Sequence, residues 1–508
     1  MSNWNFYGRE EQLAELTRIL NAGRWFFCRI EGRRRIGKTT LLSQLAQRDA
    51  ALSSRLIYMQ VPDSDEHDVA STFSQSLASS ESEQARELSP SVNNFMSMAA
   101  TIGKLCESGH IIVLDEFQYF TRVKLSAFTS FLQAEVDKLR NAQLPHGGLF
   151  VLGSLHTEMN ELLNDKAAPL YGRVTSNIPL DHWDFEDLLK LYADQELVSV
   201  KQWLTLWSFF EGVPKFYHDA YEQDLFKVGE NDFFASLLHR MFVRSSSPLS
   251  EEADTWFLRE LRGKAVSILR YLANNAGCGH ADIVAALKDE HESTALGSHI
   301  GRLVDRYKMV DKLQPVFSDS KSRNARYYVS DNFLQAWFAV AKPAREEARL
   351  KPFEKVLPLA TSRLESLEGF AFEKLIRSLH REASRKDRGD FELSSLMIGY
   401  WNRPKDATKA IEIDVVALDE ANKTIRFGNC KRSPTAHSLG VFERHVDAFL
   451  QTKDHKYLAD WKRQMVLFSP MFTVREKSHF EGKGYQARDL VDYAGMFGAR
   501  GLVTRPAG

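Results

Sequence analysis

The sequence predicts an α/β protein of several domains, and three observations lead to this prediction. The chain has 508 residues, enough for roughly three domains of about 150 residues each. Residues 1–180 alternate strand-like apolar runs with helical patterns, which is typical of a parallel sheet covered by helices. After a mostly helical middle region, residues 364–490 return to a mixture of strand and helix patterns.

Composition restricts the possible function. The 66 Lys and Arg residues balance the 67 Asp and Glu residues to a net charge of −1, so any nucleic-acid surface has to be local. The four cysteines lie far apart, which argues against a disulfide framework or a zinc site and favours a reducing cytoplasm. No stretch reaches the roughly 18 apolar residues of a membrane span, and the N-terminus lacks a signal-peptide pattern. We therefore expect a cytoplasmic protein that does not bind membranes.

The first domain, residues 1–184, has four predicted strands. They are residues 25–31, 56–59, 111–114 and 149–152. Residues 62–90 are polar, so we expect them to form a helix interrupted by an exposed loop and to contribute little to the core. Residues 185–260 are mostly helical, and a cluster of Ser and Pro at residues 244–250 marks the boundary that follows.

A phosphate-binding loop follows the first strand directly. Residues 32–39 read GRRRIGKT, fit the pattern G-x-x-x-x-G-K-[ST] and open a helix. We expect the two glycines to let backbone N–H groups turn towards the β-phosphate. Lys38 should reach the β and γ oxygens, and Thr39 should hold magnesium. The cofactors expected here are ATP and Mg²⁺. The predicted nucleotide-binding residues of the loop are Gly32, Arg33, Arg34, Arg35, Ile36, Gly37, Lys38, Thr39 and Thr40.

Catalytic groups are expected at the ends of the following strands. The third strand ends in Asp115 and Glu116, a predicted magnesium carboxylate and a predicted general base, as in a Walker B site. Ser154 follows the fourth strand and is either a contact to the γ-phosphate or part of a plain turn. Arg173 lies beside Gly172 in a predicted loop and is either a finger that acts on the nucleotide of a neighbouring copy or an ordinary surface charge.

Residues 261–342 have the elements of a winged helix. Helical patterns at 265–274, 281–288 and 294–307 precede two extended stretches that flank residues 318–321. Seven basic and three acidic residues between 293 and 326 give a local charge of +4. The residues predicted to contact the phosphates of double-stranded DNA are Arg302, Arg306, Lys321 and Arg323. The alternatives are a solvated face or a surface for protein contact.

A second candidate site lies in residues 364–508, after a linker at 343–363. A predicted helix carries Glu373, one predicted strand carries Glu412 and Asp414 on the same face, and the next ends in Asn429-Cys430-Lys431. This layout resembles the PD-(D/E)XK nuclease core, in which two acids share magnesium and a lysine acts on water. Asn429 stands where the pattern has an acid. The domain therefore either serves only in binding or assembly, or is an active nuclease in which Glu412 or Glu373 compensates for the missing acid at position 429.

Six motifs in one order resemble those of the archaeal-type ATPases, P-loop proteins of the AAA+/STAND grouping. They are FYGRE at 6–10, the loop at 32–39, LDEFQY at 114–119, GS at 153–154, APLYGR at 168–173 and GVPKFY at 212–217. The resemblance implies an ASCE ATPase core at 1–184 and a helical lid at 185–260. It also implies that Gly8 and Arg9 lie near the adenine and that Pro214 contacts the nucleotide. The C-terminal region resembles the restriction-endonuclease-like domain of the same family.

These observations favour an ATP-hydrolysing protein whose nucleotide state, ATP or ADP, repositions a winged helix and a nuclease-like domain on double-stranded DNA. One alternative is a nucleotide-gated switch or scaffold that assembles with a protein partner. Another is a magnesium-dependent nuclease regulated by ATP. A finger role for Arg173 predicts a homo-oligomer.

Overall fold

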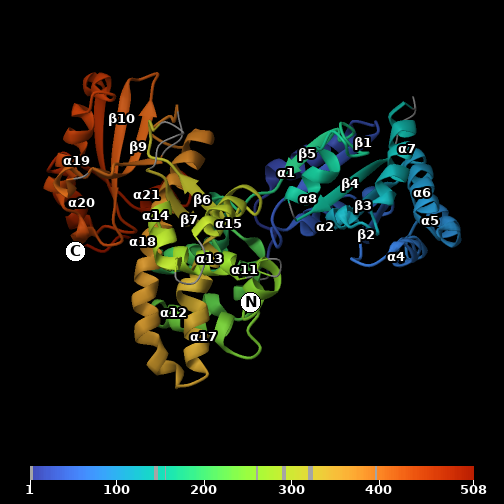
Figure 1. Cartoon of the computed structure of the whole chain (residues 1–508), viewed down its shortest axis with the longest axis horizontal. Coiled ribbons are helices and arrows are strands. Elements are labelled where there is room, and N and C mark those ends of the chain that lie inside the picture. The colour runs from blue at the N-terminus through green and yellow to red at the C-terminus, as the bar shows by residue number, and fades with distance from the viewer. Residues whose placement is uncertain are drawn as a thin grey trace. The chain divides into compact units, whose positions relative to one another are not determined.

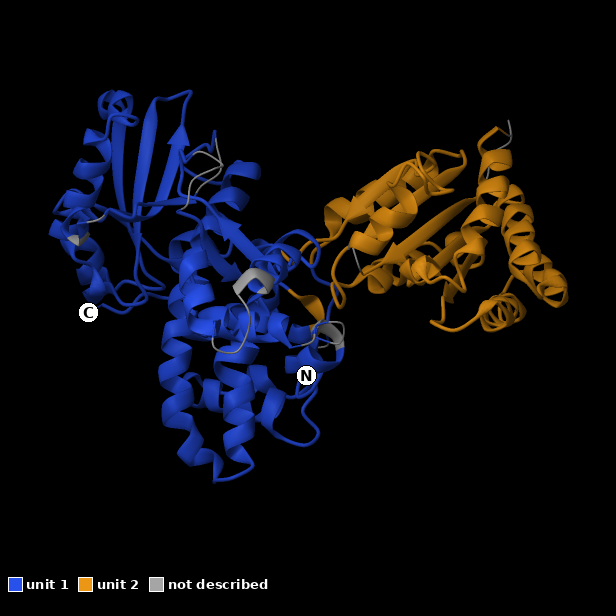
Figure 2. Ribbon diagram, viewed as in Figure 1, with its two compact units in different colours: residues 1–7, 184–212, 216–508 blue, residues 8–183, 213–215 orange. Residues whose placement is uncertain are grey.

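The computed structural model describes residues 4–141, 147–154, 156–258, 261, 263–288, 293–318, 324–394, 398–404 and 406–507. The chain forms two compact units, which Figure 2 shows in different colours. The N-terminal unit comprises residues 8–183 and 213–215. The C-terminal unit comprises residues 1–7, 184–212 and 216–508.

The N-terminal unit is built on a five-stranded parallel sheet with the order β2-β3-β4-β1-β5. The strands are β1 (Phe26–Glu31), β2 (Leu56–Gln60), β3 (Ile111–Asp115), β4 (Gly148–Gly153) and β5 (Ser176–Pro179). The four strands predicted from the sequence are confirmed. Because β4 lies between β1 and β3, the ends of these three strands meet at one edge of the sheet (Figure 1).

Helices pack against this sheet, and one of them corrects a sequence-based expectation. Residues 62–90 do form two helices with a loop between them, but the first of these carries core residues. Val69, Phe73 and Leu77 of α4 are fully buried, because apolar residues four apart share one helix face. The helices are α1 (Glu10–Asn21), α2 (Lys38–Arg48), α3 (Ala50–Ser53), α4 (Glu66–Ala78), α5 (Glu83–Leu88), α6 (Phe95–Glu107), α7 (Ala127–Asn141) and α8 (His156–Leu163).

From residue 184 on, the C-terminal unit has a helical region, followed by three helices and an antiparallel two-stranded hairpin, β6 (Val310–Leu313) and β7 (Arg326–Val329). These elements match those predicted for residues 261–342. The helices of both parts are α9 (Phe185–Asp194), α10 (Val200–Phe210), α11 (Pro214–Glu222), α12 (Glu230–Leu238), α13 (Lys264–Asn274), α14 (His280–Leu287), α15 (Ser293–Asp305), α16 (Asn332–Ala336) and α17 (Lys342–Ala348).

One long helix, α18 (Phe353–Arg385), connects the parts of this unit. It starts eleven residues earlier than the predicted helix, directly after Pro352, and contains Pro358. Two buried acids on α18 hold other elements. Glu368 accepts hydrogen bonds from Thr205 on α10 and from Arg432. Glu382 accepts from the backbone N–H groups at the start of α9.

The second sheet has five strands in the order β12-β11-β10-β9-β8. Strands β8 to β10 are antiparallel neighbours, whereas β10, β11 and β12 run parallel. Helix α19 packs against β9 and α18 against β10. The elements are β8 (Ile398–Trp401), β9 (Glu412–Asp419), β10 (Thr424–Cys430), α19 (Leu439–Gln451), β11 (Lys462–Phe468), α20 (Val474–Glu481), β12 (Gln486–Arg488) and α21 (Leu490–Met496).

A β-bulge interrupts this sheet at Asp414. Ile398 pairs with Val416 and Tyr400 with Ile413, so two residues of β9 lie opposite Gly399 alone. A Cβ atom at Gly399 would lie 2.7 Å from the carbonyl oxygen of Ile413, so only glycine allows this close approach. Bulges redirect side chains beside functional sites. Among the described residues, no helix has the length and apolar character needed to cross a membrane.

Candidate active sites

The phosphate-binding loop forms as predicted between β1 and α2. Gly37 and Arg35 have left-handed φ angles of 91° and 67°, so backbone N–H groups can turn inward. The ammonium of Lys38 lies within the loop and donates to the carbonyl oxygens of Gly32, at 2.8 Å, and Arg33, at 3.1 Å. Burial lowers the pKa of Lys38 to about 8, although the carboxylates of the site act in the other direction. An anion in the loop would favour the charged form.

The carboxylate of Asp115, at the end of β3, contacts side chains from α2 and β2. Its Oδ2 accepts hydrogen bonds from Thr39 Oγ1, at 2.7 Å, and from the hydroxyl of Tyr58, at 2.8 Å. Its Oδ1 accepts from the N–H of Glu116 at 2.8 Å. Burial and the charge of Asp115 raise the pKa of Tyr58. The oxygens of Thr39 and Asp115 are ligands that fit magnesium.

Glu116 has a left-handed φ of 56°, which is uncommon for a residue other than glycine and typical of functional sites. Gln118 donates to its carboxylate from Nε2. Ser154 Oγ, at the end of β4, lies 3.4 Å from Oε2, and Arg34 Nη1 lies 3.8 Å from Oε1. The fold thus brings Ser154 to the predicted general base.

The remaining predicted residues lie in different surroundings. Arg9 is buried and donates to the carbonyl of Ile36 in the loop at 3.0 Å. Pro214 starts α11, and residues 213–215 belong to the N-terminal unit (Figure 2). Both nitrogens of the Arg173 fork donate to Asp137 on α7, each at 2.8 Å. Arg173 is therefore paired within its own unit.

The second candidate site forms around Asp414. Its Oδ2 accepts from the N–H of Cys430 at 2.8 Å and lies 3.1 Å from Asn429 Nδ2 and 3.4 Å from Lys431 Nζ. Glu373 on α18 interacts electrostatically with Asp414. Burial, and then the charge of Asp414, raise the pKa of Glu373 to about 8. The fold therefore brings four of the five predicted residues together.

Glu412 lies at the margin of this cluster. Its side chain is 56% exposed, and it accepts a hydrogen bond from Arg326 Nη1 at 2.8 Å. Arg326 also stacks on Trp401, with its guanidinium 4.7 Å from the ring centre. Carboxylate oxygens of Asp414 and Glu373 and the amide oxygen of Asn429 form a donor set that suits a hard divalent cation.

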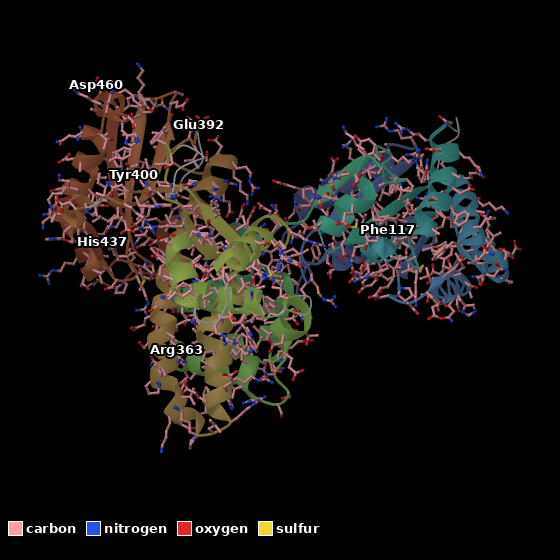
Figure 3. The ribbon with its side chains drawn as sticks, in the orientation of Figure 1. Phe117, Arg363, Glu392, Tyr400, His437 and Asp460 are labelled. Carbon is pink, nitrogen blue, oxygen red and sulfur yellow. The ribbon has the colours of Figure 1, made fainter. Side chains whose placement is uncertain are left out.

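Two residues that the sequence analysis missed complete this cluster. His437, labelled in Figure 3, has Nδ1 at 2.8 Å from Asn429 Oδ1 and Nε2 at 3.1 Å from Ser469 Oγ. Ser469 donates to the carbonyl of Lys431 at 2.8 Å. Ser469 follows β11, a strand that was not predicted, so no local signal pointed to it.

Comparisons with known proteins agree with the geometry of the first site. Residues 6–217 match a family described as an ATPase domain predominantly from Archaea. The chain is a P-loop ATPase. Residues 337–439 of the ATPase match a second family, described as archaeal and bacterial proteins of unknown function.

Individual proteins resemble the ATPase over most of its length. An uncharacterized protein of Methanocaldococcus jannaschii is 25% identical over 442 residues, which cover 84% of this chain and 87% of that protein. The structure of a Walker-type ATPase of Pyrococcus abyssi aligns with a TM-score of 0.50 and 15% identity, covering 66% of this chain and 96% of that one. A structure of the Aeropyrum pernix ORC2 protein aligns with a TM-score of 0.46 and 13% identity, covering 72% and 97%.

The predicted DNA-contacting residues are only partly within the described chain. Arg302 on α15 and Arg306 just after it are exposed. Lys321 and Arg323 lie outside the described residues. Arg326, one of the seven basic residues counted in this region, is paired with Glu412 and so contributes less free charge than the sequence suggests.

Proposed function

We propose that this ATPase couples ATP hydrolysis to action on double-stranded DNA. The supporting observation is the pair Arg302 and Arg306, exposed at the end of the third helix of a helix-helix-helix-hairpin module, where a winged helix contacts DNA. The same compact unit contains the Asp414 cluster. The four cysteines are free, which supports a cytoplasmic location for this function.

In this proposal the residues of the first site have separate roles. Lys38 and the N–H groups of the loop bind the phosphates. Thr39 and Asp115 would hold Mg²⁺, which neutralises phosphate charge when bound. Glu116 accepts a proton from the attacking water, and Ser154 keeps Glu116 and the water aligned. Arg9 holds the loop through its hydrogen bond to Ile36, on the side where the adenine binds. Gly8 and Pro214 contact the nucleotide.

Salt-dependent DNA binding tests the proposal. Replacing Arg302 and Arg306 by Ala should weaken duplex binding and reduce the slope of log affinity against log salt by about two, because each lost phosphate contact releases one counterion fewer. The matched control replaces Arg349 and Lys355, two exposed cations near the junction of α17 and α18, and should keep the slope. An unchanged slope in the first variant would favour the protein-assembly alternative.

A second candidate function is divalent-cation binding with weak nuclease activity at the Asp414 cluster. The convergence of Asp414, Asn429, Lys431 and Glu373 supports it. We expect little plasmid cleavage by the wild type in Mg²⁺, since an amide adds no charge to the site. Asn429→Glu should raise cleavage, and adding Asp414→Ala should remove it again. Strong cleavage by the wild type that Lys431→Ala abolishes would instead show that the amide suffices.

A further inference from the structure

The side-chain amide of Asn429 lies between the carboxylate of Asp414 and the ring of His437, which contact its two ends. Its Nδ2 lies 3.1 Å from Asp414 Oδ2, and its Oδ1 lies 2.8 Å from His437 Nδ1. The nitrogen and oxygen of an amide exchange places when the group rotates by 180°, with almost no movement of other atoms. The hydrogen-bond network therefore decides which end faces Asp414.

Ser469 determines the direction of this network. The carbonyl of Lys431 can only accept, so the single hydroxyl hydrogen of Ser469 is donated to it at 2.8 Å. Ser469 Oγ must then accept from His437 Nε2, which lies 3.1 Å away. A neutral imidazole has one N–H group, so Nδ1 of His437 has a free lone pair directed at Asn429.

The surroundings of His437 favour its neutral form. Among the described residues its ring nitrogens contact Asn429 and Ser469, and neither of these is a carboxylate. A lone pair on Nδ1 requires the N–H end of the amide, and this turns the amide oxygen of Asn429 towards Asp414.

Without a further ligand, each orientation of the Asn429 amide places two hydrogen-bond acceptors against each other. If Nδ2 faces Asp414, two acceptors meet at His437; if Oδ1 faces Asp414, two oxygens meet 3.1 Å apart. Only the second conflict is relieved by a cation, because both oxygens can bind it. The network thus favours an oxygen-inward amide whenever a cation is present.

We propose that His437 is a positioning residue for a divalent cation, because it accepts the amide N–H of Asn429 and so directs the amide oxygen to the cation held by Asp414. This inference rests on the second candidate function above. It explains how a neutral amide can act where the nuclease pattern has a carboxylate. Metal-binding groups are commonly oriented by such outer partners, whose removal costs 10- to 100-fold in affinity.

Manganese binding to the full chain without nucleotide tests the proposal, measured by the paramagnetic resonance of free Mn²⁺. His437→Phe, which keeps a ring beside Phe472, should weaken the Asp414-dependent site by about 10- to 100-fold. His437→Asn places an acceptor near the position of Nδ1 and should recover most of this loss. In an Asn429→Asp background there is no amide to orient, so His437→Phe should change affinity less than about threefold. Thermal unfolding without metal verifies that each variant folds.

Three outcomes would contradict the proposal in distinguishable ways. Equal Mn²⁺ affinity of the wild type and His437→Phe would overturn the role of His437 and leave the cation site intact. Equal weakening by Phe and Asn at position 437 would show that the ring only supports the fold. Identical Mn²⁺ binding by the wild type and Asp414→Ala would overturn the cation site itself, and this inference with it.

Discussion

Lys38 and Glu116 separate nucleotide binding from turnover at the level of single residues. Lys38→Ala removes the charge inside the loop, so we expect ATP binding to be lost or severely weakened. Glu116→Gln keeps the shape of the site but cannot take a proton, so binding should persist while turnover falls by about 10²- to 10⁴-fold. Equilibrium nucleotide binding and phosphate release measure the two effects.

The control for this pair is Glu107→Gln, the same exchange at an exposed position on α6, which should alter neither quantity. Wild-type turnover in the Glu116 variant would refute the assignment of the general base.

His380 makes the C-terminal unit sensitive to acid. Its ring is buried on α18, and Nε2 accepts from Arg426 Nη1 at 3.2 Å. Burial, then the charge of Arg426, lowers the pKa of His380 to about 3. The folded state therefore keeps the ring neutral, while the unfolded chain takes up a proton below its pKa of about 6.5. The stability that the neutral ring contributes is present above pH 6.5 and is lost as the pH falls.

The loss should approach about 1.4 kcal/mol per pH unit between pH 6.5 and pH 3. Unfolding of the C-terminal unit, followed at pH 7, 6 and 5, measures it. We expect His380→Gln to lower stability at pH 7 and to lose less stability per pH unit than the wild type as the pH falls, whereas His479→Gln, at an exposed histidine of the same unit, should keep the wild-type pH dependence. An equal pH dependence in the wild type and in His380→Gln would contradict the buried neutral state, because comparing the two cancels the opposite contribution of Glu373, whose pKa is raised.

Residues inside one local motif could be predicted from the sequence, whereas partners from distant strands could not. The loop at 32–39 and the pair Asp115–Glu116 each lie within a few residues, and the fold brings Thr39 to Asp115 as predicted. Tyr58, His437 and Ser469 reach their sites only through strand register and loop conformation. No spacing in the sequence encodes those distances.

Helix α18 depends on a buried acid for its contacts with other elements. Glu368 is 2% exposed, and its two oxygens accept from Thr205, at 2.8 Å, and Arg432, at 2.7 Å. Arg432→Ala leaves a buried carboxylate without its cation, so we expect a loss of about 3 kcal/mol in the free energy of unfolding. Adding Glu368→Gln should recover at least half of it, because the amide is neutral.

The comparison for this element is Arg385→Ala on the same helix. Arg385 pairs with Asp184 but is 58% exposed, so its loss should cost less than about 1 kcal/mol. Denaturant unfolding of the single and double variants distinguishes the two kinds of pair. Equal costs at positions 432 and 385 would show that the burial of Glu368 has no energetic consequence.

Elements with a strong apolar pattern were predictable, and elements that tertiary contacts define were not. Strands β1 to β4 are apolar runs that match the structure closely. Strand β5 has four residues and a single buried position, and β11 begins with exposed Lys462 and Arg463. The bulge at Asp414 depends on close packing against Gly399, which only the folded sheet reveals.

At the scale of the whole molecule, Arg173 connects hydrolysis to assembly. Its two hydrogen bonds to Asp137 hold it within its own unit, so it can reach the nucleotide of a second copy only when this pair opens. If it acts as a finger, the ATPase rate per chain should rise with protein concentration, and Arg173→Ala should remove the rise without affecting ATP binding.

Asp137→Asn tests the pair from the other side. Loss of the carboxylate weakens the hold on Arg173, so we expect this variant to reach the fast rate at a severalfold lower protein concentration than the wild type. Lys138→Ala, which breaks only the exposed pair with Glu135 on the same helix, should behave like the wild type. ATPase rate and molecular mass, measured over one concentration series, test this role of Arg173. If the chain stays monomeric at full activity, with or without Arg173, the guanidinium has no role beyond its bond to Asp137.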